Sequence, residues 1–426
     1  MGKPKNRYLV LLVLALGVCS AYLPAYLRWT FYDTLFEAVH LTPTQFAATL
    51  SLYGLTSMIF YAPGGYLADK FSPRKMLAFA FASTGLLTFW YATFPGFISQ
   101  MIIYALWGMI ATAFFWSAML KVTNGLGSQS EQGSMFGLLE GSRGVVNCLL
   151  SFAALYFYNK LGETVAGVTG VLVGCGILCI ISAILVWIVV PDKVNVVTKE
   201  EDKIHLKDIG KVLKLPAVWV LSIVVLACYS VYIGNTYLTP YMTEILGVSA
   251  TAAGALAIIR NYFLMFIAGP TGGIIADKTG SITRVIICCY ILMAIALGGF
   301  VILPASPSMA TASIVLILLF CAAIFAMRGI YFAPIDECRV PKHLVGIAVG
   351  VVSMIGFFPD VYMNAIVGSL MEKFPGVQGY KYVFIIMLVF AIVGLVSSII
   401  LSRIVKKSKA LTASEAAAEA AAEASE

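Results

Sequence analysis

Six ionisable side chains lie inside long apolar stretches of this chain, where their charges are best placed to do chemistry. They are Arg28, Arg143, Arg260, Arg328, Glu140 and Asp360. Arginine holds carboxylate or phosphate through two parallel hydrogen bonds, so the two arginines left after pairing with the two acids would suit an organic anion. A buried carboxyl group that changes protonation state can carry a proton. We therefore predict an anion site, with Asp360 as the first candidate for proton coupling and Glu140 as the second.

Helical spacing places further polar and aromatic residues beside these charges. Arg143, for example, lies three residues from Glu140, so the two side chains can touch on one helix face. The expected substrate contacts are Arg28, Tyr22, Tyr26, Arg143, Tyr232, Asn235, Arg260, Asn261 and Arg328. Structural alternatives stay open: Glu140 and Arg143 as a structural pair, Arg28 reaching the outer interface, and Asp360 neutralising Arg260 or Arg328.

The elements that carry these residues are apolar blocks of about 20 residues, the length that a helix needs to cross about 30 Å of hydrocarbon. With 60% hydrophobic and 12% charged residues, the composition also lies outside the range of soluble domains. The blocks are 8–29, 43–63, 76–94, 98–121, 133–158, 165–190, 216–239, 249–272, 285–304, 309–333, 344–366 and 380–403. The sequence therefore predicts an all-α, polytopic protein with twelve transmembrane helices in the lipid bilayer.

The positive charges predict the orientation of these helices. With a cytoplasmic N-terminus, 21 of the 28 Lys and Arg residues fall on the inside, and only Lys160, Lys373 and Lys381 fall clearly outside. Cytoplasmic loops carry the excess of Lys and Arg, so we expect both termini in the cytoplasm and the chain in the cell inner membrane. The first block is too long for a cleaved signal peptide, and we read it as a retained helix.

One long polar segment divides the blocks into six and six. We predict an N-terminal bundle over 1–190, a cytoplasmic linker over 191–215 and a C-terminal bundle over 216–409. The spacing of apolar residues in the linker suits a short helix along the membrane face, and a solvated linker explains it equally well. Residues 410–426 form a low-complexity Ala/Glu stretch, for which we expect a solvated, partly helical tail.

The two halves share a short motif. PGGYLADK covers 63–70 and PTGGIIADK covers 270–278, so Asp69 and Asp277 lie 208 residues apart, about half the chain. Both copies follow the second block of their half and precede a basic residue and another block. Parallel repeats of this kind are typical of two-bundle transporters.

These motifs closely resemble the signature that follows the second helix in the major facilitator superfamily, G-x-x-x-D-[RK]-x-G-[RK]-[RK]. The first copy matches it well and the second more loosely. Lys75, Gly280 and Arg284 are among the matches, and the residues expected to act in gating are Gly65, Asp69, Lys70, Arg74, Gly273, Asp277 and Lys278. The resemblance covers about 8–403 and implies two rocking bundles around a central cavity. We predict that these residues form a gate of charge pairs, whereas the plain alternative is that their positive charges only anchor the loops.

A weaker resemblance points to the organophosphate and organic-anion branches of this superfamily. It rests on AYLRW (25–29) and DKFSPRK (69–75). In those branches an arginine late in the first helix holds the anionic group of the substrate, a role that would carry over to Arg28. There is no matching arginine late in the seventh block, where Thr236 or Tyr237 stands.

We therefore predict a secondary transporter of a small organic anion that works by alternating access and is driven by proton symport or anion exchange. The alternative is a solute sensor of the same fold that binds without transport. The histidines His40, His205 and His343 all lie in loops, and the sequence carries no zinc-protease, P-loop or nucleophilic-serine motif. We expect no enzyme activity, metal or cofactor, no nucleic-acid partner, and a monomer.

Overall fold

The computed structural model describes residues 6–126, 132–192, 210–338, 340 and 344–423 of the chain, and every regular element in this part is helical. Among the described residues, nine helical segments are long and apolar enough to cross a membrane. Three more helices, of 28, 19 and 29 residues, complete the set: α3 (Pro43–Lys70), α4 (Pro73–Tyr91) and α7 (Gln132–Lys160). The prediction of an all-α protein with twelve transmembrane helices is confirmed.

Each half supplies six crossings, some of them built from consecutive helical pieces. The other N-terminal elements are α1 (Arg7–Tyr26), η1 (Leu27–Trp29), α2 (Tyr32–Val39), α5 (Phe97–Ile110), η2 (Ala111–Trp116), α6 (Ser117–Leu126) and α8 (Val165–Val189). The C-terminal half begins with α10 (Pro216–Gly234), η5 (Asn235–Tyr237), α11 (Leu238–Pro240), η6 (Tyr241–Ile245), α12 (Ala250–Ile258), η7 (Ile259–Phe263) and α13 (Leu264–Thr279). It continues with α14 (Ile282–Ile302), η8 (Pro307–Met309), α15 (Ala310–Arg328), α16 (Pro334–Glu337), α17 (Val345–Gly356), α18 (Pro359–Lys373) and α19 (Val377–Glu423).

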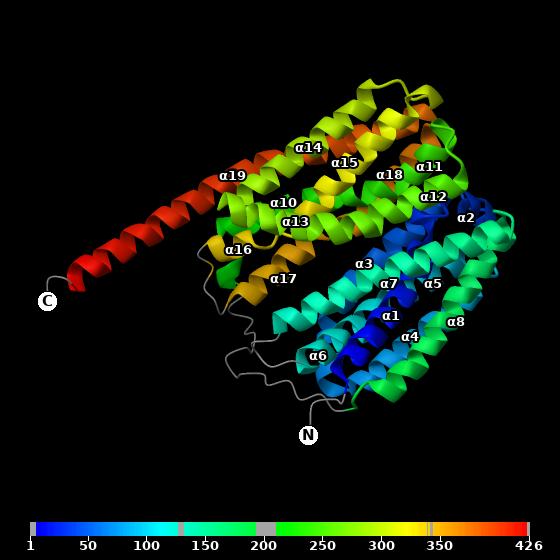
Figure 1. Ribbon diagram of the computed structural model, residues 1–426, viewed down its shortest axis with the longest axis horizontal. Helices are drawn as coiled ribbons and strands as arrows, with labels where there is room; N and C mark the ends of the chain where they lie inside the picture. The colour runs from blue at the N-terminus through cyan, green and yellow to red at the C-terminus, as the bar shows by residue number, and fades with distance from the viewer. Residues whose placement is uncertain (1–5, 127–131, 193–209, 339, 341–343, 424–426) are drawn as a thin grey trace.

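The two halves form two helical bundles that lie side by side (Figure 1). We call the face with the ends near Arg7 and Lys70 the terminal face, and the face with the ends near Trp29 and Lys160 the opposite face. At the opposite face, which lies at the upper right in Figure 1, α2 of the first bundle approaches α11 of the second, and α7 approaches α12. The bundles are therefore joined at the end of the molecule away from the linker.

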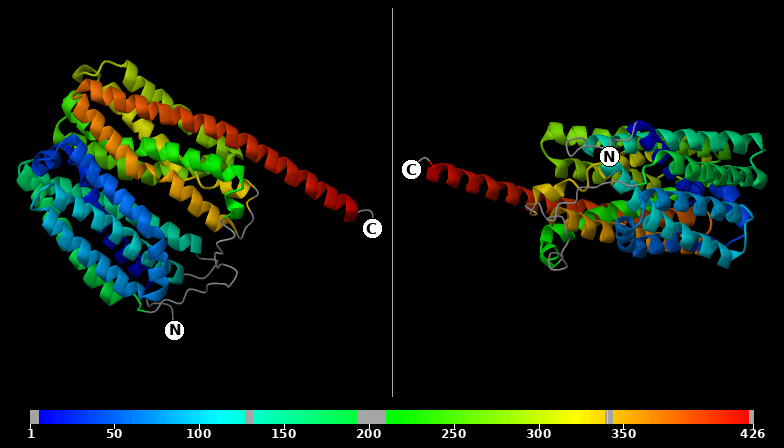
Figure 2. Two further views of the ribbon diagram at one scale, coloured as in Figure 1. Left: turned by 180° about the vertical axis from the view of Figure 1, so that it is seen from behind. Right: turned by 90° about the horizontal axis from the view of Figure 1, so that it is seen from below.

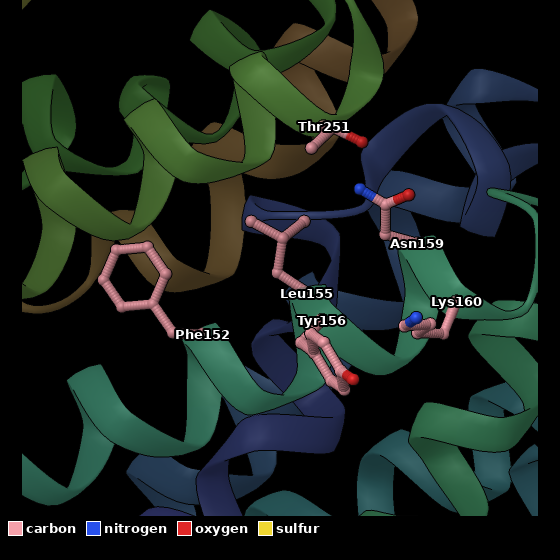
Figure 3. Close-up of a pocket in the computed structure, with 6 residues that line it drawn as sticks. All are labelled: Phe152, Leu155, Tyr156, Asn159, Lys160 and Thr251. Atoms are coloured by element: carbon pink, nitrogen blue, oxygen red, sulfur yellow. The ribbon is translucent and has the colours of Figure 1, made fainter.

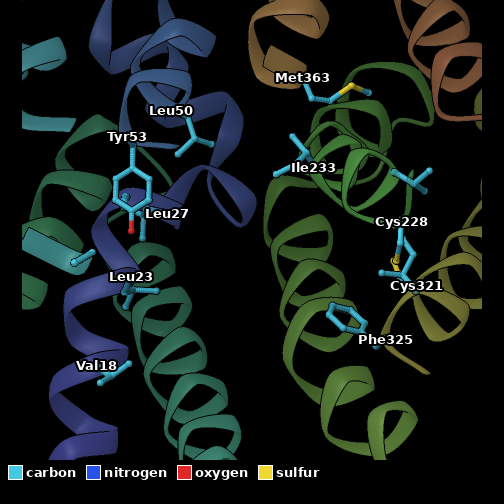
Figure 4. Close-up of a cluster of buried hydrophobic side chains, with 14 of the residues drawn as sticks. Val18, Leu23, Leu27, Leu50, Tyr53, Cys228, Ile233, Cys321, Phe325 and Met363 are labelled. Carbon is cyan, nitrogen blue, oxygen red and sulfur yellow. The ribbon is translucent and has the colours of Figure 1, made fainter. Parts of the chain in front are cut away.

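Each bundle has its own apolar interior. Figure 4 shows Val18 and Leu23 of α1 inside the first bundle, and Cys228 and Phe325 on facing helices of the second. The last helix, α19, is 47 residues long and projects past the bundles in both views of Figure 2. Alanine and glutamate are strong helix formers, so the Ala/Glu stretch continues the helix as far as Glu423.

The motif repeat has a structural counterpart in two close helix approaches. A Cβ added at Gly64 would lie 2.5 Å from the Thr112 carbonyl oxygen, and one added at Gly272 would lie 2.3 Å from the Ala326 carbonyl oxygen. Gly64 and Gly272 stand 208 residues apart, as the two motif copies do. In both halves a glycine thus lets the second crossing pack on the backbone of the fourth.

The eleventh crossing is broken, which differs from the single helix expected over 344–366. α17 ends at Gly356 and α18 begins at Pro359, because proline has no N–H to continue the hydrogen-bond ladder. Asp360 therefore lies in the first turn of a new helix rather than in the middle of a long one. A carboxylate is favoured there by the helix dipole.

Candidate binding site at the bundle seam

A cluster of charged and phenolic side chains lies where α18 begins. Asp360 accepts a 3.0 Å hydrogen bond from the Tyr229 hydroxyl through Oδ2. The Arg328 guanidinium lies 3.9 Å from the centroid of the Tyr232 ring, and it is close enough to Asp360 to interact with it electrostatically. Asp360, Arg328, Tyr229 and Tyr232 all belong to the C-terminal bundle, and we call them the central cluster.

The N-terminal bundle closes this cluster with tyrosines. Tyr26 and Tyr53 have ring centroids 5.8 Å apart, and both interact electrostatically with Asp360. Trp29 continues the contact, with its ring centroid 5.3 Å from that of Tyr232. The central cluster therefore faces the seam between the bundles, where a solute would touch both halves.

Helix α3 approaches Asp360 very closely. A Cβ added at Gly54 would lie 2.7 Å from the Asp360 Cβ atom. Farther along the same pair of helices, a Cβ at Gly368 would lie 2.4 Å from the Cβ of Ala47. The position of Asp360 is thus tied directly to the packing of the two bundles.

Arg260 lies in a different environment from Arg328. It is 0% exposed and sits in the π-helical turn η7, and its Nη2 donates a 2.7 Å hydrogen bond to Thr239 Oγ1. Its Nε and Nη1 atoms are buried and have no hydrogen-bond partner. Asn261, the next residue, accepts a 2.5 Å hydrogen bond from Asn235. The structure thus brings together three of the expected contacts, Arg260, Asn261 and Asn235.

Arg28 is held inside the N-terminal bundle. Its guanidinium donates to the Phe46 carbonyl oxygen at 2.8 Å and to Thr49 Oγ1 and the Tyr104 hydroxyl, each at 2.9 Å. The guanidinium also lies 3.9 Å from the centroid of the Phe46 ring. Arg28 is 2% exposed, and these neutral contacts occupy both of its terminal nitrogens. Arg28 therefore lies neither at the outer interface nor in the central cluster in this conformation.

Arg143 and the tyrosines of α1 lie on the N-terminal side of the seam. The Arg143 guanidinium is 5.9 Å from the centroid of Trp116, and its carbonyl oxygen accepts a bond from the Cys19 thiol. Tyr22 stacks edge-on against Phe115 with centroids 5.1 Å apart. The Glu140 side chain lies outside the described residues, so its pairing with Arg143 stays a prediction.

The gating motif is described only in part. Arg74 Nε donates a 2.6 Å hydrogen bond to the carbonyl oxygen of Val190, at the end of α8, where a cation is favoured by the helix dipole. Lys70 and Lys278 are exposed at the terminal face, and a Cβ added at Gly273 would meet open space. The surroundings of Gly65 and the side chains of Asp69 and Asp277 are not among the described parts of the chain, and neither are residues 193–209 of the linker.

Polar contacts join the bundles at the opposite face. The Thr239 hydroxyl donates to the Trp29 carbonyl oxygen at 2.6 Å, and the Thr243 hydroxyl donates to Asp33 Oδ2 at 2.5 Å. Farther out, Thr251 contacts Glu163, and Glu372 accepts a 3.1 Å bond from the Thr44 backbone N–H. The carboxylates in these contacts accept from neutral donors. This arrangement closes the opposite face in the present conformation.

A pocket of about 460 Å³ opens between the bundles at the same face. Figure 3 shows its wall from α7, with Phe152, Leu155 and Tyr156 on one helix and Thr251 of α12 across from them. It lies beside the Glu163–Thr251 contact and contains none of the predicted substrate contacts. In the described part of the chain, no group of three His, Cys, Asp or Glu side chains could hold a metal ion.

Several site residues were missed in the sequence. Thr239 and Trp29 carry a key contact through a hydroxyl and a backbone oxygen, and neither stands out in an apolar block. Tyr53 was missed because it lies in a block without internal charges. The signal that could have found it is its position one residue before Gly54, where two helices cross closely.

These features define a class of protein, a membrane transporter made of two six-helix bundles with a charged cluster at their seam. The Major Facilitator Superfamily model matches residues 14–361, and the chain belongs to this family. It moves a solute across the membrane by alternating access, and the family is one of transporters rather than enzymes.

Relatives and solved structures agree with this assignment. The inner membrane protein YqcE of Escherichia coli is 31% identical over 382 residues, which cover 88% of this chain and 90% of that protein. The inner membrane protein YihN of Escherichia coli is 30% identical over 417 residues, or 96% and 99% of the two chains. A bacterial homologue of the human lysosomal transporter Spinster has the same fold, with a TM-score of 0.76 at 14% identity over 96% of this chain and 99% of that one.

Proposed function

We propose that this protein is a secondary active transporter of a small organic anion, driven by proton symport or anion exchange. The observation that supports this is the central cluster at the seam, where Arg328 and Asp360 stand within electrostatic range of each other. Arginine binds carboxylates and phosphates well, and uptake of a proton by a neighbouring carboxyl group can favour binding of that anion.

The cluster suggests how a proton and an anion could be coupled. While Asp360 is ionised, it offsets the charge of Arg328. Protonation of Asp360 would free Arg328 to bind an incoming anion, and Tyr229 can hydrogen-bond to either form of the carboxyl group. An anion that enters a negative-inside cell moves against the membrane potential, which costs about 2.3 kcal/mol per elementary charge per 100 mV. Uptake therefore needs a co-transported cation or an exchanged anion.

The wider arrangement belongs to the same proposal. We place the protein in an inner membrane, which is supported by the names of the two Escherichia coli relatives, and both termini in the cytoplasm because of the distribution of Lys and Arg. The bundles comprise residues 1–190 and 216–409, and the protein works as a monomer. The predicted gate around Asp69 and Asp277 closes the terminal face when the opposite face opens.

Transport in proteoliposomes tests this proposal. Purified protein should exchange a labelled organic acid, and an inward proton gradient should make the acid accumulate. Asp360→Asn should keep exchange but lose accumulation, whereas Glu37→Gln, which changes an exposed carboxylate on α2, should keep both. Accumulation that survives in Asp360→Asn would favour anion exchange. Binding without flux would favour a solute sensor.

A further inference from the structure

We propose that Arg260 binds the charged end of the transported solute, and that this end is a single carboxylate rather than a phosphate dianion. The inference rests on the proposed anion transport and specifies its substrate class. The charged end of the solute would then lie closer to the opposite face than the central cluster does. Tyr232, which stacks on Arg328, and Thr239, which contacts Arg260, are seven residues apart on consecutive helical pieces, or about 10 Å.

The first argument is the set of unpartnered donors. Arg260 is completely buried, yet only its Nη2 atom has a hydrogen-bond partner, and Nε and Nη1 have none. The hydroxyl of Thr236 and the indole N–H of Trp29 are also buried without a partner. A buried donor left without an acceptor costs free energy, and a charged one costs more. The free donors of Arg260 lack an acceptor, which a carboxylate would supply.

The second argument is charge balance. The groups around Arg260 in the described part of the chain are neutral: Thr239, the amides of Asn235 and Asn261, and the Cys321 thiol. Arg328, by contrast, has Asp360 within range. Among the described residues, the interior of the C-terminal bundle therefore carries one uncompensated positive charge. An isolated buried charge is strongly unfavourable, and one negative charge on the solute removes that cost.

The third argument is the way the chain holds Arg260 in place. Arg260 and Asn261 form the middle of the π-helical turn η7, and such turns are frequent at functional sites. Asn261 is tied to Asn235, which in turn accepts a bond from the Cys321 thiol of α15. Three crossings thus fix the backbone around a guanidinium that has no charged partner of its own.

The charge count decides between classes of anion. A phosphate monoester carries about −1.5 to −2 near neutral pH, so it would need a second cation. In the resting state, before Asp360 takes up a proton, Arg328 is offset by Asp360 and Arg260 supplies the one unpaired charge that first meets the solute. A carboxylate fits this count, with the uncharged part of the molecule extending toward Tyr232 and Trp29, whose rings are in contact.

The test is ligand-induced thermal stabilisation of the full-length purified protein. The panel is gluconate and lactate as carboxylates, glucose 6-phosphate as a dianion, glucose as a neutral analogue, and sodium chloride for an inorganic anion. The variants are Arg260→Gln and Arg260→Lys, with Arg403→Gln, an exposed arginine on α19, as the matched control. A carboxylate should raise the melting temperature of the wild type and of Arg403→Gln, and glucose 6-phosphate should not.

Arg260→Gln should weaken the apparent carboxylate affinity roughly 10- to 150-fold, the loss expected for a hydrogen bond to a charged group. It should also raise the melting temperature of the ligand-free protein, because it removes a buried charge without a partner. A lower melting temperature together with unchanged carboxylate binding would overturn the proposal and make Arg260 structural. Arg260→Lys should keep the charge and bind more weakly than the wild type.

Other outcomes separate this inference from the proposed function. If glucose 6-phosphate stabilises the wild type more than any carboxylate, the substrate class is wrong although anion transport stands. The same holds if chloride alone acts through Arg260 and carboxylates do not compete with it. If no anion binds or is transported by the wild type, both proposals fail.

Discussion

Replacing Gly368 with alanine should open the opposite face of the transporter. Gly368 of α18 packs against α3 of the other bundle, where an added Cβ would lie 2.4 Å from the Ala47 Cβ and 2.8 Å from the Pro43 carbonyl oxygen. Carbon atoms in contact stand about 3.5–4.0 Å apart, so the two helices would have to separate by about 1 Å. The clash exists only while the two bundles are closed at this face.

The size of the effect follows from overpacking. Extra methyl groups in well-packed contacts cost about 1–3 kcal/mol, and here only the closed conformation bears that cost. The gain in helix propensity from Gly to Ala, about 1 kcal/mol, acts on both conformations. The ratio of closed to open molecules should therefore fall by roughly 5- to 150-fold.

Distances between spin labels across the opposite face can measure this ratio. Cysteines replacing the exposed Ile98 and Ile302 would carry the labels, with the exposed Cys288 changed to serine. Gly350→Ala, in the same crossing but with nothing near the added Cβ, is the matched control. Ala47→Gly in the Gly368→Ala background should restore part of the closed population. Equal distance distributions for Gly368→Ala and Gly350→Ala would refute this account of the seam.

Three further predictions concern the gate, the anion site and pH. Asp69→Asn should impair transport without lowering expression, because it removes a gating charge and leaves the side-chain volume unchanged. Unchanged exchange kinetics in this variant would mean that the motif only anchors its loop in the cytoplasm. Arg328→Lys should weaken anion binding by about 1–3 kcal/mol, a roughly 5- to 150-fold higher apparent Kd, because the planar guanidinium is lost, and an unchanged Kd by calorimetry would contradict this. Burial raises the pKa of the Asp33 carboxyl above its usual range, an effect partly offset by the Thr243 hydrogen bond. We expect this carboxyl to regain water when the face opens, so closure should take up a proton. The closed fraction should be highest below the ordinary Asp pKa and fall as pH rises toward the raised one. Asp33→Asn should lose this dependence, whereas Glu37→Gln should keep it.

The sequence alone determined the class of structure. Apolar blocks of membrane-spanning length and the doubled motif around Asp69 and Asp277 were enough to predict twelve helices, two bundles and the family. These features are local or periodic, because a helix in lipid must satisfy its own backbone hydrogen bonds and must be apolar along its whole length. The same signal identified Arg260, Arg328 and Asp360, since a charge in an apolar block is conspicuous.

The tertiary structure decided what each of these charges faces. Arg28, Arg260 and Arg328 look alike in the sequence, yet both terminal nitrogens of Arg28 bond to neutral groups of its own bundle, and Arg328 stands beside Asp360 at the seam. Arg260 has a single hydroxyl partner. The partners come from residues 18 to 76 positions away, or from a crossing that is interrupted before Pro359. Helical periodicity says which residues share a face, but only the packing of helices determines which side chains meet across that face.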